Sequence, residues 1–362
     1  MNGARIFLFA IGSVFCGLLL WSLRFVPPEF RAWEKVRSDD NILFEPNMTI
    51  DDVEVGDLGY KSWVKQLQHP RRVAFTTDAT GFRNAGNPRF PEIVVVGDSY
   101  VVGTGVSDNE TFPSRIEQRL SVPVYNYGFA SGAIQVFLND PRFANRMPRV
   151  VVYAPLEHRL IPRNLDIRYP KWPPDTPTAP GAASGWWHDV GEEVENFFFR
   201  LNMDNGVATF ARYQYNGLMY RVRGLDGVTT FEGATILRLP IGEQKLDVPV
   251  EQRNPAGVIS TLENLKSMLS ERGSELVFCP LFAMGTIYPE VYPQADRVRI
   301  QNPSFLDAVI AGAKASGVRT VDLRESFRKN RSPYLYQPDD SHWNARAIGL
   351  AADELASELK SP

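Results

Sequence analysis

Ser99 stands where a serine can act as a nucleophile. It directly follows the run IVVVGD, which has the composition of a buried parallel strand ending in a glycine turn. A serine in such a strand-to-helix turn faces the open end of the sheet, where backbone N–H groups can receive a developing oxyanion. The tripeptide Gly-Asp-Ser is also common in ordinary turns, so Ser99 alone does not predict an activity.

The segment QPDDSHWN near the C-terminus supplies a matching base. His342 is one of four histidines, and Asp340 and Asp339 precede it by two and three residues. A nucleophilic serine needs a base, and that base needs an acceptor that fixes its tautomer and stabilises its cation. One short turn provides both groups. The alternatives are an Asp that caps a helix beside a surface histidine, or half of a metal site.

No metal site and no cofactor are expected. The remaining histidines stand in unrelated contexts: His69, His158 and His188. No cluster of Cys or Asp adds a third ligand at metal-site spacing. The run GTGVSD lacks the third glycine of a dinucleotide-binding loop. The pattern therefore favours a serine hydrolase that uses Ser99 and His342.

The elements around these residues alternate between strands and helices. Short β-branched runs predict strands at residues 91–98, 122–128, 148–155, 274–281 and 318–323. Helical patterns lie at residues 110–120, 134–145, 258–273, 304–317 and 344–359. This alternation predicts a three-layer α/β/α sandwich with a parallel sheet, whose ligands bind beyond the carboxyl ends of the strands. The turns that carry Ser99 and His342 fall at that edge.

The rest of the chain divides into further parts. Residues 26–90 are mixed in character and are expected to lead from an anchor, residues 1–25, to the body. The body comprises residues 91–160 and 250–362. Between its halves, residues 161–249 begin with a run rich in Pro, Gly and aromatic residues, which predicts one long insertion outside the sheet.

The N-terminus predicts a membrane anchor. Residues 6–23, IFLFAIGSVFCGLLLWSL, carry no charge and reach the lower limit for crossing a hydrocarbon core of about 30 Å. No small-residue cleavage site follows, which favours a retained single-pass transmembrane helix over a cleaved signal peptide. A buried core helix is the alternative. The flanking charges, Arg5 against Arg24, Arg31 and Lys35, do not indicate an orientation.

Composition excludes one class of partner. The 362 residues are 44% hydrophobic and 22% charged, with a formal net charge of −3 and no block of Lys or Arg. A nucleic-acid-binding face would be basic, so no nucleic-acid partner is expected. Of the two cysteines, Cys16 lies in the predicted anchor and Cys279 in a predicted strand, so the body contains no disulfide.

The blocks around Ser99 and His342 resemble those of the SGNH/GDSL hydrolases. IVVVGDSY looks like their first block, VYNYGFASG like their second, and DSHWNARAIGLAADELASEL like their terminal block. More narrowly, LSERGSELVFCPLFAMGTIYPE, GVRTVDL and DSHW resemble the periplasmic alginate O-acetyltransferase group. The resemblance implies the flavodoxin-like SGNH fold. In that group the Asp-x-His element precedes the serine, so the match is to blocks rather than end to end.

The resemblance implies a role for each residue of the proposed triad. Ser99 would be the nucleophile and His342 the general base. Asp340 would orient the imidazole, by the Asp-x-His-Trp spacing of the acetyltransferase group. Asp339 is the alternative, because ordinary GDSL esterases use Asp-x-x-His. The oxyanion donors would be the backbone N–H groups of Ser99 and of Gly132.

Other substrate-binding groups are implied with alternatives. Gly128 could replace Gly132 as the oxyanion donor, and Asn126 lies in the same block. The third block should bring an Asn after the third strand, but the chain has YAPLEHRL there. Some acetyltransferase-like members carry Glu and Arg at that place, which assigns Glu157 and Arg159 to substrate binding; a surface ion pair is the other interpretation.

The implied function is transfer of an acyl group, with acetyl expected, or ester hydrolysis on an extracytoplasmic polysaccharide. The protein would be held by one transmembrane helix with its catalytic domain in the periplasm. Its partners would be a carbohydrate or acyl-ester substrate and a membrane protein that donates the acyl group. The alternatives are a lipase or general GDSL esterase, and a non-catalytic glycan-binding or assembly protein with the same fold.

Overall fold

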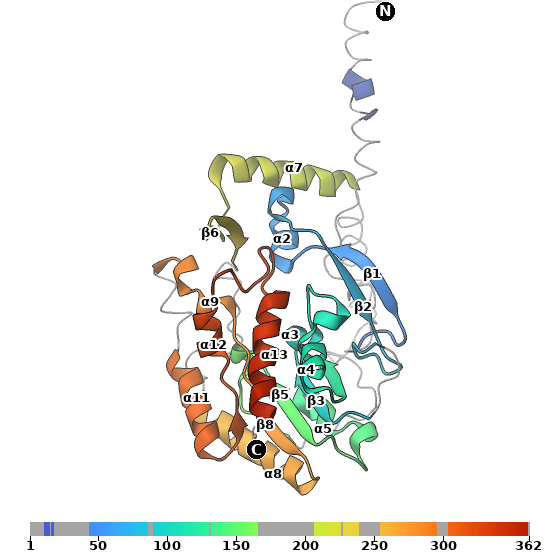
Figure 1. Cartoon of the computed structure of the whole chain (residues 1–362). Helices are drawn as coiled ribbons and strands as arrows, with labels where there is room; N and C mark the ends of the chain where they lie inside the picture. Colours follow the sequence, from blue (N-terminus) through green and yellow to red (C-terminus); the bar gives the residue numbers. More distant parts are fainter. Residues whose placement is uncertain are drawn as a thin grey trace, which may run out of the picture.

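A parallel sheet forms the centre of the molecule (Figure 1). The computed structural model describes residues 11–14, 16–17, 43–85, 90–129, 132–165, 206–225, 227–238, 254–294 and 303–360. The strands are β3 (Ile93–Gly97), β4 (Val124–Gly128), β5 (Val150–Ala154), β8 (Glu275–Phe278) and β9 (Arg319–Thr320). All pair in parallel, in the order β4-β3-β5-β8-β9. The prediction of an α/β protein with a central parallel sheet is confirmed.

The two strands β3 and β5 set the direction of the sheet. Every residue in them is buried, and their runs IVVVG and VVVYA are apolar on both faces. Such runs are typical of parallel strands that are covered on both sides. The chain passes from β3 outward to β4 and then returns to β5 on the other side of β3. The carboxyl ends of β3 and β5 therefore flank the topological switch point where ligands of such sheets bind.

Helices cover both faces of the sheet. One face packs against α4 (Phe112–Leu120), α12 (Arg324–Lys329) and α13 (Ala345–Lys360), and the other against α5 (Ile134–Leu138), α8 (Pro255–Glu271) and α11 (Pro303–Ala315). Alternate side chains of each strand enter two separate cores. In β3, Val95 joins the first core and Val94 the second. The described elements thus form three layers, helix–sheet–helix.

Several elements are shorter than the sequence predicted, most clearly one helix and one strand. The helix expected at residues 134–145 ends at Leu138, and a 3-10 turn, Pro141–Phe143, follows. Pro141 has no N–H for a continuing helix, and the Asp140 side chain accepts from the backbone N–H of Arg142 instead. The strand expected at residues 318–323 is reduced to β9, which pairs only with the last two residues of β8.

The segment predicted as a lead-in is folded against the body. Its strands β1 (Thr49–Glu54) and β2 (Arg71–Thr76) form an antiparallel pair. The helix α2 (Asp57–Ser62) and the 3-10 turn η2 (Lys65–Leu67) lie between them in the chain. The backbone N–H groups of Leu58 and Gly59 donate to the carbonyl of Asp339, so this segment contacts the loop that carries His342.

The predicted insertion contributes one long helix and a hairpin. These are α7 (Gly206–Arg223) and the antiparallel strands β6 (Val228–Phe231) and β7 (Ala234–Leu237). The ring of Tyr213 on α7 packs edge-on against Trp63, 5.3 Å between centroids. Residues 161–165 of the insertion follow the 3-10 turn after β5, and its residues 166–205, 226 and 239–249 lie outside the described residues.

The predicted membrane anchor can be compared with the structure only in small part. Of residues 1–25, only 11–14 and 16–17 belong to the described part, and they are helical. Among the described residues, no helix combines the length and apolar character needed to span a bilayer.

The packing of α13 on the sheet gives a test of the fold. Leu355 is fully buried in the core on that face. Leu355→Ala is expected to lower the free energy of unfolding by about 2–5 kcal/mol, because it removes buried methyl groups and leaves a cavity. Glu354→Ala, on the exposed side of the same helix, should change it little. Equal losses in urea denaturation of the two variants would contradict this packing.

Candidate active site

The turn after β3 presents Ser99 at the switch point. Ser99 is the first residue of the short helix α3 (Ser99–Val102), and Asp98 caps that helix by accepting from the backbone N–H of Tyr100 at 3.1 Å. The first N–H groups of a helix have no carbonyl partner within it. The Ser99 N–H therefore lies in a position suited to an oxyanion.

The loop before α13 presents His342 at the same edge. It is closed by two backbone bonds, from Gln337 N–H to the His342 carbonyl at 3.0 Å and from Asn344 N–H to the Leu335 carbonyl at 3.1 Å. The buried ring of Trp343 packs against Phe282 and Phe327 below the loop: centroid distances are 5.4 and 4.7 Å. These contacts fix the backbone from which the imidazole projects.

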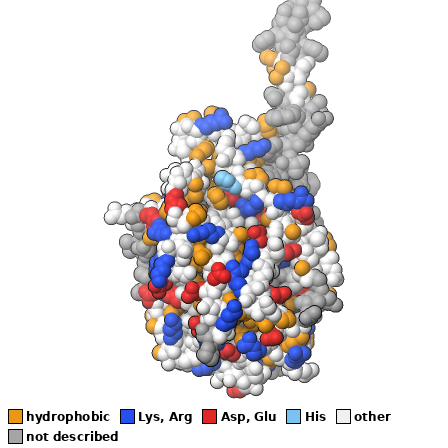
Figure 2. Space-filling view, in the orientation of Figure 1, with side chains coloured by type: hydrophobic (Ala, Val, Ile, Leu, Met, Phe, Trp, Pro, Cys, Tyr) orange, Lys and Arg blue, Asp and Glu red, His pale blue; other side chains and the backbone are white. Residues whose placement is uncertain are grey.

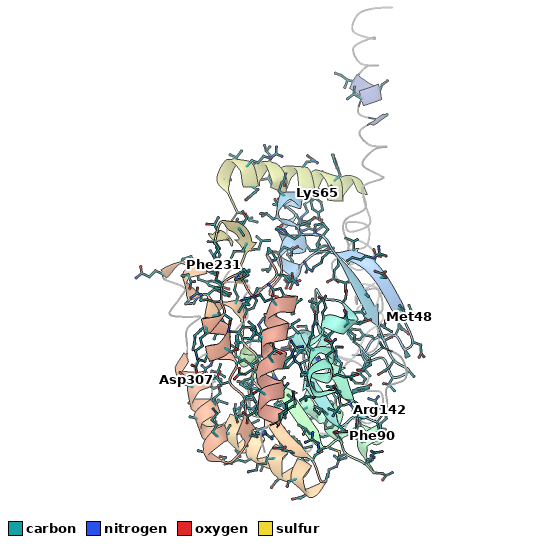
Figure 3. All side chains as sticks on the ribbon, in the orientation of Figure 1. Met48, Lys65, Phe90, Arg142, Phe231 and Asp307 are labelled. Atoms are coloured by element: carbon teal, nitrogen blue, oxygen red, sulfur yellow. The ribbon has the colours of Figure 1, made fainter. Side chains whose placement is uncertain are left out.

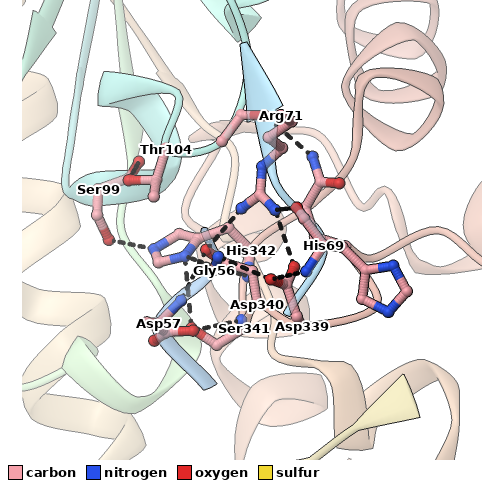
Figure 4. Close-up of polar contacts among 12 residues, drawn as sticks. Gly56, Asp57, His69, Arg71, Ser99, Thr104, Asp339, Asp340, Ser341 and His342 are labelled. Carbon is pink, nitrogen blue, oxygen red and sulfur yellow. Dashed lines mark hydrogen bonds and ion pairs between the residues drawn. The ribbon is translucent and has the colours of Figure 1, made fainter. Parts of the chain in front are cut away.

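Ser99, His342 and Asp340 form a continuous series of hydrogen bonds (Figure 4). The Nε2 atom of His342 lies 2.7 Å from the Ser99 Oγ, and its Nδ1 atom lies 2.5 Å from the Asp340 Oδ1. The same carboxylate oxygen accepts from the backbone N–H of His342 at 2.9 Å. Both His342 and Asp340 are buried. The imidazole can thus take a proton from the serine while the carboxylate stabilises the resulting cation.

Tyr100 encloses the imidazole from one side. Its ring lies 4.8 Å from the His342 ring, centroid to centroid, and its hydroxyl donates to the carbonyl of Ser341 at 2.7 Å. Burial, together with the nearby Asp98 carboxylate, raises the pKa of Tyr100 well above its usual value. The phenol therefore stays neutral and keeps donating to the loop that carries His342.

Asp339, the alternative partner of His342, points away from it. Its Oδ2 atom accepts from the backbone N–H groups of Gly56 and His69, each at 2.9 Å. A Cβ atom at position 56 would lie 2.1 Å from the Asp339 carbonyl oxygen, so this approach requires glycine. The structure thus places Asp340 against the imidazole and uses Asp339 to bind the N-terminal segment.

Arg71 joins the two carboxylates. Its guanidinium lies 2.8 Å from Asp339 Oδ1 and 3.1 Å from Asp340 Oδ2, with only 17% of the side chain exposed. Burial by itself lowers the pKa of Arg71, but the charges of Asp340 and Asp339 outweigh it, so the pKa lies above its usual value. Arg71 therefore stays cationic and neutralises charge beside the partner of His342.

Asp57 completes this network and raises the question of a metal. Its carboxylate accepts from the backbone N–H and the hydroxyl of Ser341, each at 2.8 Å, and its own N–H donates to Asp340 Oδ2 at 3.1 Å. Asp57, Asp340 and His342 lie close enough to hold a metal ion. However, both ring nitrogens of His342 already contact Ser99 and Asp340, so the geometry suits proton transfer better than metal binding.

The backbone N–H groups of Gly132 and Gly128, the two proposed oxyanion donors, each donate to another group of the protein. Gly132 has a positive φ of 59°, and a Cβ atom there would lie 2.7 Å from the Asp98 nitrogen, so its loop packs directly on the Ser99 turn. The N–H of Gly132 donates to the Phe129 carbonyl at 3.1 Å. The N–H of Gly128 donates to the Asn126 side chain at 2.9 Å.

The side chain of Asn126 links two elements by hydrogen bonds. Its buried amide accepts from Gly128 and donates to the Val101 carbonyl at 3.0 Å. These bonds tie the end of β4 to α3. The side chain thus supports the Ser99 turn from behind.

Glu157 and Arg159 follow β5 but contact different partners. Glu157 Oε1 accepts from the backbone N–H of Ala283 at 3.0 Å and from the Thr286 hydroxyl at 2.7 Å, at the start of the short helix α9 (Met284–Ile287). Arg159 Nε lies 3.5 Å from Asp98 Oδ2, next to Ser99. Of these two residues, Arg159 is therefore the one placed beside the proposed nucleophile.

Three residues of this site, Asp57, Arg71 and Tyr100, were not selected from the sequence. Tyr100 had a usable signal, because it adjoins Ser99. Asp57 and Arg71 had none, since they stand outside the blocks that carry Ser99 and His342. Only the folded chain shows that they surround Asp340.

A serine, an imidazole and a carboxylate in hydrogen-bonded order at the carboxyl edge of a parallel sheet have the arrangement of serine hydrolases on α/β folds. Residues 241–362 match the family described as SGNH hydrolase-like domain, acetyltransferase AlgX. The resemblance to the SGNH superfamily and to this branch is thereby confirmed for that part of the chain. The matched part includes Asp340 and His342, whereas Ser99 precedes it.

Two solved structures are similar to the chain over most of its length. One is a Slackia heliotrinireducens protein assigned to the SGNH hydrolases, with 12% identity, a TM-score of 0.35, and coverage of 74% of this chain and 97% of that one. The other is an alpha/beta hydrolase enzyme from the metagenome of Lake Arreo, Spain, with 12% identity, a TM-score of 0.37, and coverage of 75% and 96%. None of the curated proteins matches the chain.

The contacts of Asp339 and Asp340 predict different effects when each is replaced by asparagine. Asp340→Asn should lower kcat for p-nitrophenyl acetate by about 10³–10⁴-fold, because the amide cannot hold the required tautomer of His342 or stabilise its cation. Asp339→Asn should lower kcat much less and act mainly on the melting temperature. A larger loss of kcat in Asp339→Asn would contradict the assignment of Asp340.

The position of Arg71 predicts a change in the pH profile. In Arg71→Met the two buried carboxylates face each other without a cation, and we expect the pair to bind a proton. A protonated Asp340 no longer supports the His342 cation, so activity is lost at low pH and returns as the pH rises. The acidic limb of kcat/KM for p-nitrophenyl acetate should therefore move to higher pH. Arg71→Lys, which keeps the positive charge, should largely restore the original position of the acidic limb. If kcat/KM is instead lowered by the same factor at every pH in both variants, Arg71 has a merely structural role.

Proposed function

We propose that this chain transfers an acyl group, with acetyl the expected group, to or from a carbohydrate hydroxyl outside the cytoplasm. The observation that carries the proposal is the hydrogen bond between Ser99 Oγ and His342 Nε2 at 2.7 Å, with Asp340 on the other ring nitrogen. The match of residues 241–362 to an SGNH hydrolase-like acetyltransferase family supports the same class of chemistry.

The geometry supports a two-step reaction. The Ser99 Oγ attacks the acyl carbonyl carbon while its proton passes to His342 Nε2, and the oxyanion forms beside the Ser99 N–H. His342 then gives that proton to the departing oxygen, which leaves an ester on Ser99. In the second step an acceptor hydroxyl loses its proton to His342 and attacks the Ser99 ester. The bond between the acyl carbon and Ser99 Oγ then breaks, His342 returns the proton to Ser99 Oγ, and the acceptor carries the acyl group away. Asp340 stabilises the imidazolium in both steps.

Transfer and hydrolysis differ only in the acceptor. Water gives hydrolysis, and a sugar hydroxyl gives transfer, so the triad is compatible with both. The acetyltransferase character of the matched family favours transfer. Under this proposal the acyl group comes from a membrane partner and the polysaccharide is the acceptor, with the protein anchored in the membrane and its catalytic domain in the periplasm.

The absence of the expected Asn from the third block favours a second candidate function, glycan binding without catalysis. YAPLEHRL brings Glu157 and Arg159 where an SGNH esterase would place an Asn, and Glu157 is engaged with α9. A protein that binds glycans without catalysis could tolerate this loss. A lipase or general esterase would instead keep the reaction but deliver no acyl group to a sugar.

A covalent intermediate distinguishes these functions. The full chain in detergent is incubated briefly with p-nitrophenyl acetate, quenched in acid and digested. We expect one acetyl group on the Ser99 peptide by mass spectrometry, and none in Ser99→Ala or His342→Ala, because attack needs both groups. A polysaccharide acceptor should then remove the acetyl faster than water does. Glycan binding without any acetylated peptide would select the non-catalytic protein.

A further inference from the structure

The outer face of α7 is apolar. Tyr215, Leu218, Val222 and Leu225 expose 62%, 55%, 67% and 37% of their surface. The first three are spaced three and four residues apart, which places them on one side of α7. Leu225 lies just past the end of the helix, after Gly224 with its positive φ of 74°. A helix on the surface of a soluble domain normally turns charged or polar residues outward, so this stripe calls for a partner.

The inner face of α7 is held against the body by other residues. The buried Tyr213 packs on Trp63, and its hydroxyl accepts from the Gln68 side chain at 2.9 Å. The guanidinium of Arg212 lies 4.2 Å from the centre of the Trp63 ring. The helix is therefore docked through one face, and the apolar stripe is the face that remains outward.

The charges around the stripe are basic. Residues 206–225 contain Arg212, Arg221 and Arg223 and no Asp or Glu. Lys65, exposed on the neighbouring turn η2, lies close beneath α7 (Figure 3). Hydrophobic and basic side chains share this end of the surface in Figure 2. An apolar stripe flanked by Arg and Lys has the composition of helices that lie in the interface of an anionic bilayer.

The N-terminal helical residues lie at the same end of the molecule. Figure 1 shows residues 11–14 and 16–17 beyond α7, where α7 runs across the end of the molecule. Ile11 and Val14 are also exposed, so this end holds six of the nine exposed large hydrophobic side chains among the described residues. Apolar surface is thus concentrated where the chain approaches its predicted anchor.

From these features we infer that α7 binds the surface of an anionic lipid bilayer through Tyr215, Leu218 and Val222, with Leu225 just past its C-terminal end. The helix lies in the plane of the membrane, the aliphatic side chains enter the acyl boundary, and Arg221 and Arg223 contact lipid phosphates. This surface goes beyond the proposed acyl transfer and does not depend on it.

Membrane binding at α7 would also position the active site. Trp63, on which α7 packs, directly follows α2. The backbone of α2 donates from Leu58 and Gly59 to the Asp339 carbonyl. The segment with α2 and Trp63 therefore lies between the bilayer-binding helix and the loop that carries His342. This arrangement would hold the active site at a short, fixed distance from the lipid.

The depth of residue 218 tests this inference. The full chain carrying Cys16→Ser and Leu218→Cys is labelled with a nitroxide and reconstituted into vesicles of phosphatidylglycerol and phosphatidylethanolamine. The remaining Cys279 is fully buried, and burial raises its thiol pKa, so it should not react. We expect the nitroxide at 218 to collide more with oxygen, which concentrates in lipid, than with a water-soluble nickel chelate.

A matched label on another helix provides the control. Ser260 is exposed on α8, at the end of the molecule opposite α7 in Figure 1, and a nitroxide on Ser260→Cys should collide mainly with the nickel chelate. Adding Arg221→Gln and Arg223→Gln should shift the 218 label toward water. Hydrolysis of p-nitrophenyl acetate in detergent should be unchanged in every variant, which separates this test from that of the proposed function.

Two results would overturn membrane binding. The first is a nitroxide at 218 that is as accessible to the nickel chelate as the one at 260. The second is spin–spin broadening at 218 that disappears when labelled protein is diluted with unlabelled protein, because α7 would then contact a second copy of the chain.

Discussion

The site depends on the neutralisation of two adjacent buried carboxylates. Asp339 and Asp340 are fully buried, and two neighbouring negative charges in a protein interior are costly unless they are paired and hydrogen-bonded. Arg71 supplies the cation, and the backbone N–H groups of Gly56 and Asp57 supply hydrogen bonds. The cation and the backbone N–H groups that compensate the charge of Asp340 thus come from the N-terminal segment, which makes that segment part of the proposed catalytic unit.

The sheet positions the proposed nucleophile, Ser99. Buried runs in β3 and β5 put Ser99 at the switch point, and the Gly132 loop and the Asn126 amide support its turn from two sides. The imidazole arrives from a loop some 240 positions later in the chain. The reactive pair is thus held by the tertiary fold, whereas each partner is oriented by local contacts: Asp98 caps α3, and Asp340 bonds the ring of His342.

Much of this arrangement was predictable, and the exceptions have physical causes. Apolar runs with two covered faces identify β3 and β5 directly, and the resemblance to the acetyltransferase group favours Asp340 over the alternative, Asp339. The early end of α5 was also visible in Pro141, which outweighs the helical pattern around it. Arg71 and Asp57 could not be found, because a bond between residues 268 or more positions apart leaves no periodic trace in either segment. The helix α7 itself was not predicted, because its residues fall in the long insertion outside the sheet, and the sequence does not tell which face of such a helix the body covers.

The docking of residues 56–71 on the loop at 339–342 has a consequence for the timing of synthesis. Ser99 is made well before its proposed base and the carboxylate partner of that base, because His342 follows it by 243 positions. In a nascent chain that has formed β3 and β4, the Ser99 hydroxyl has no base beside it. Arg71 has not yet met its counterions, Asp339 and Asp340. Under the proposed chemistry, reactivity thus arises only when these two distant segments meet, so chains that stop before His342 should be inert rather than partly active.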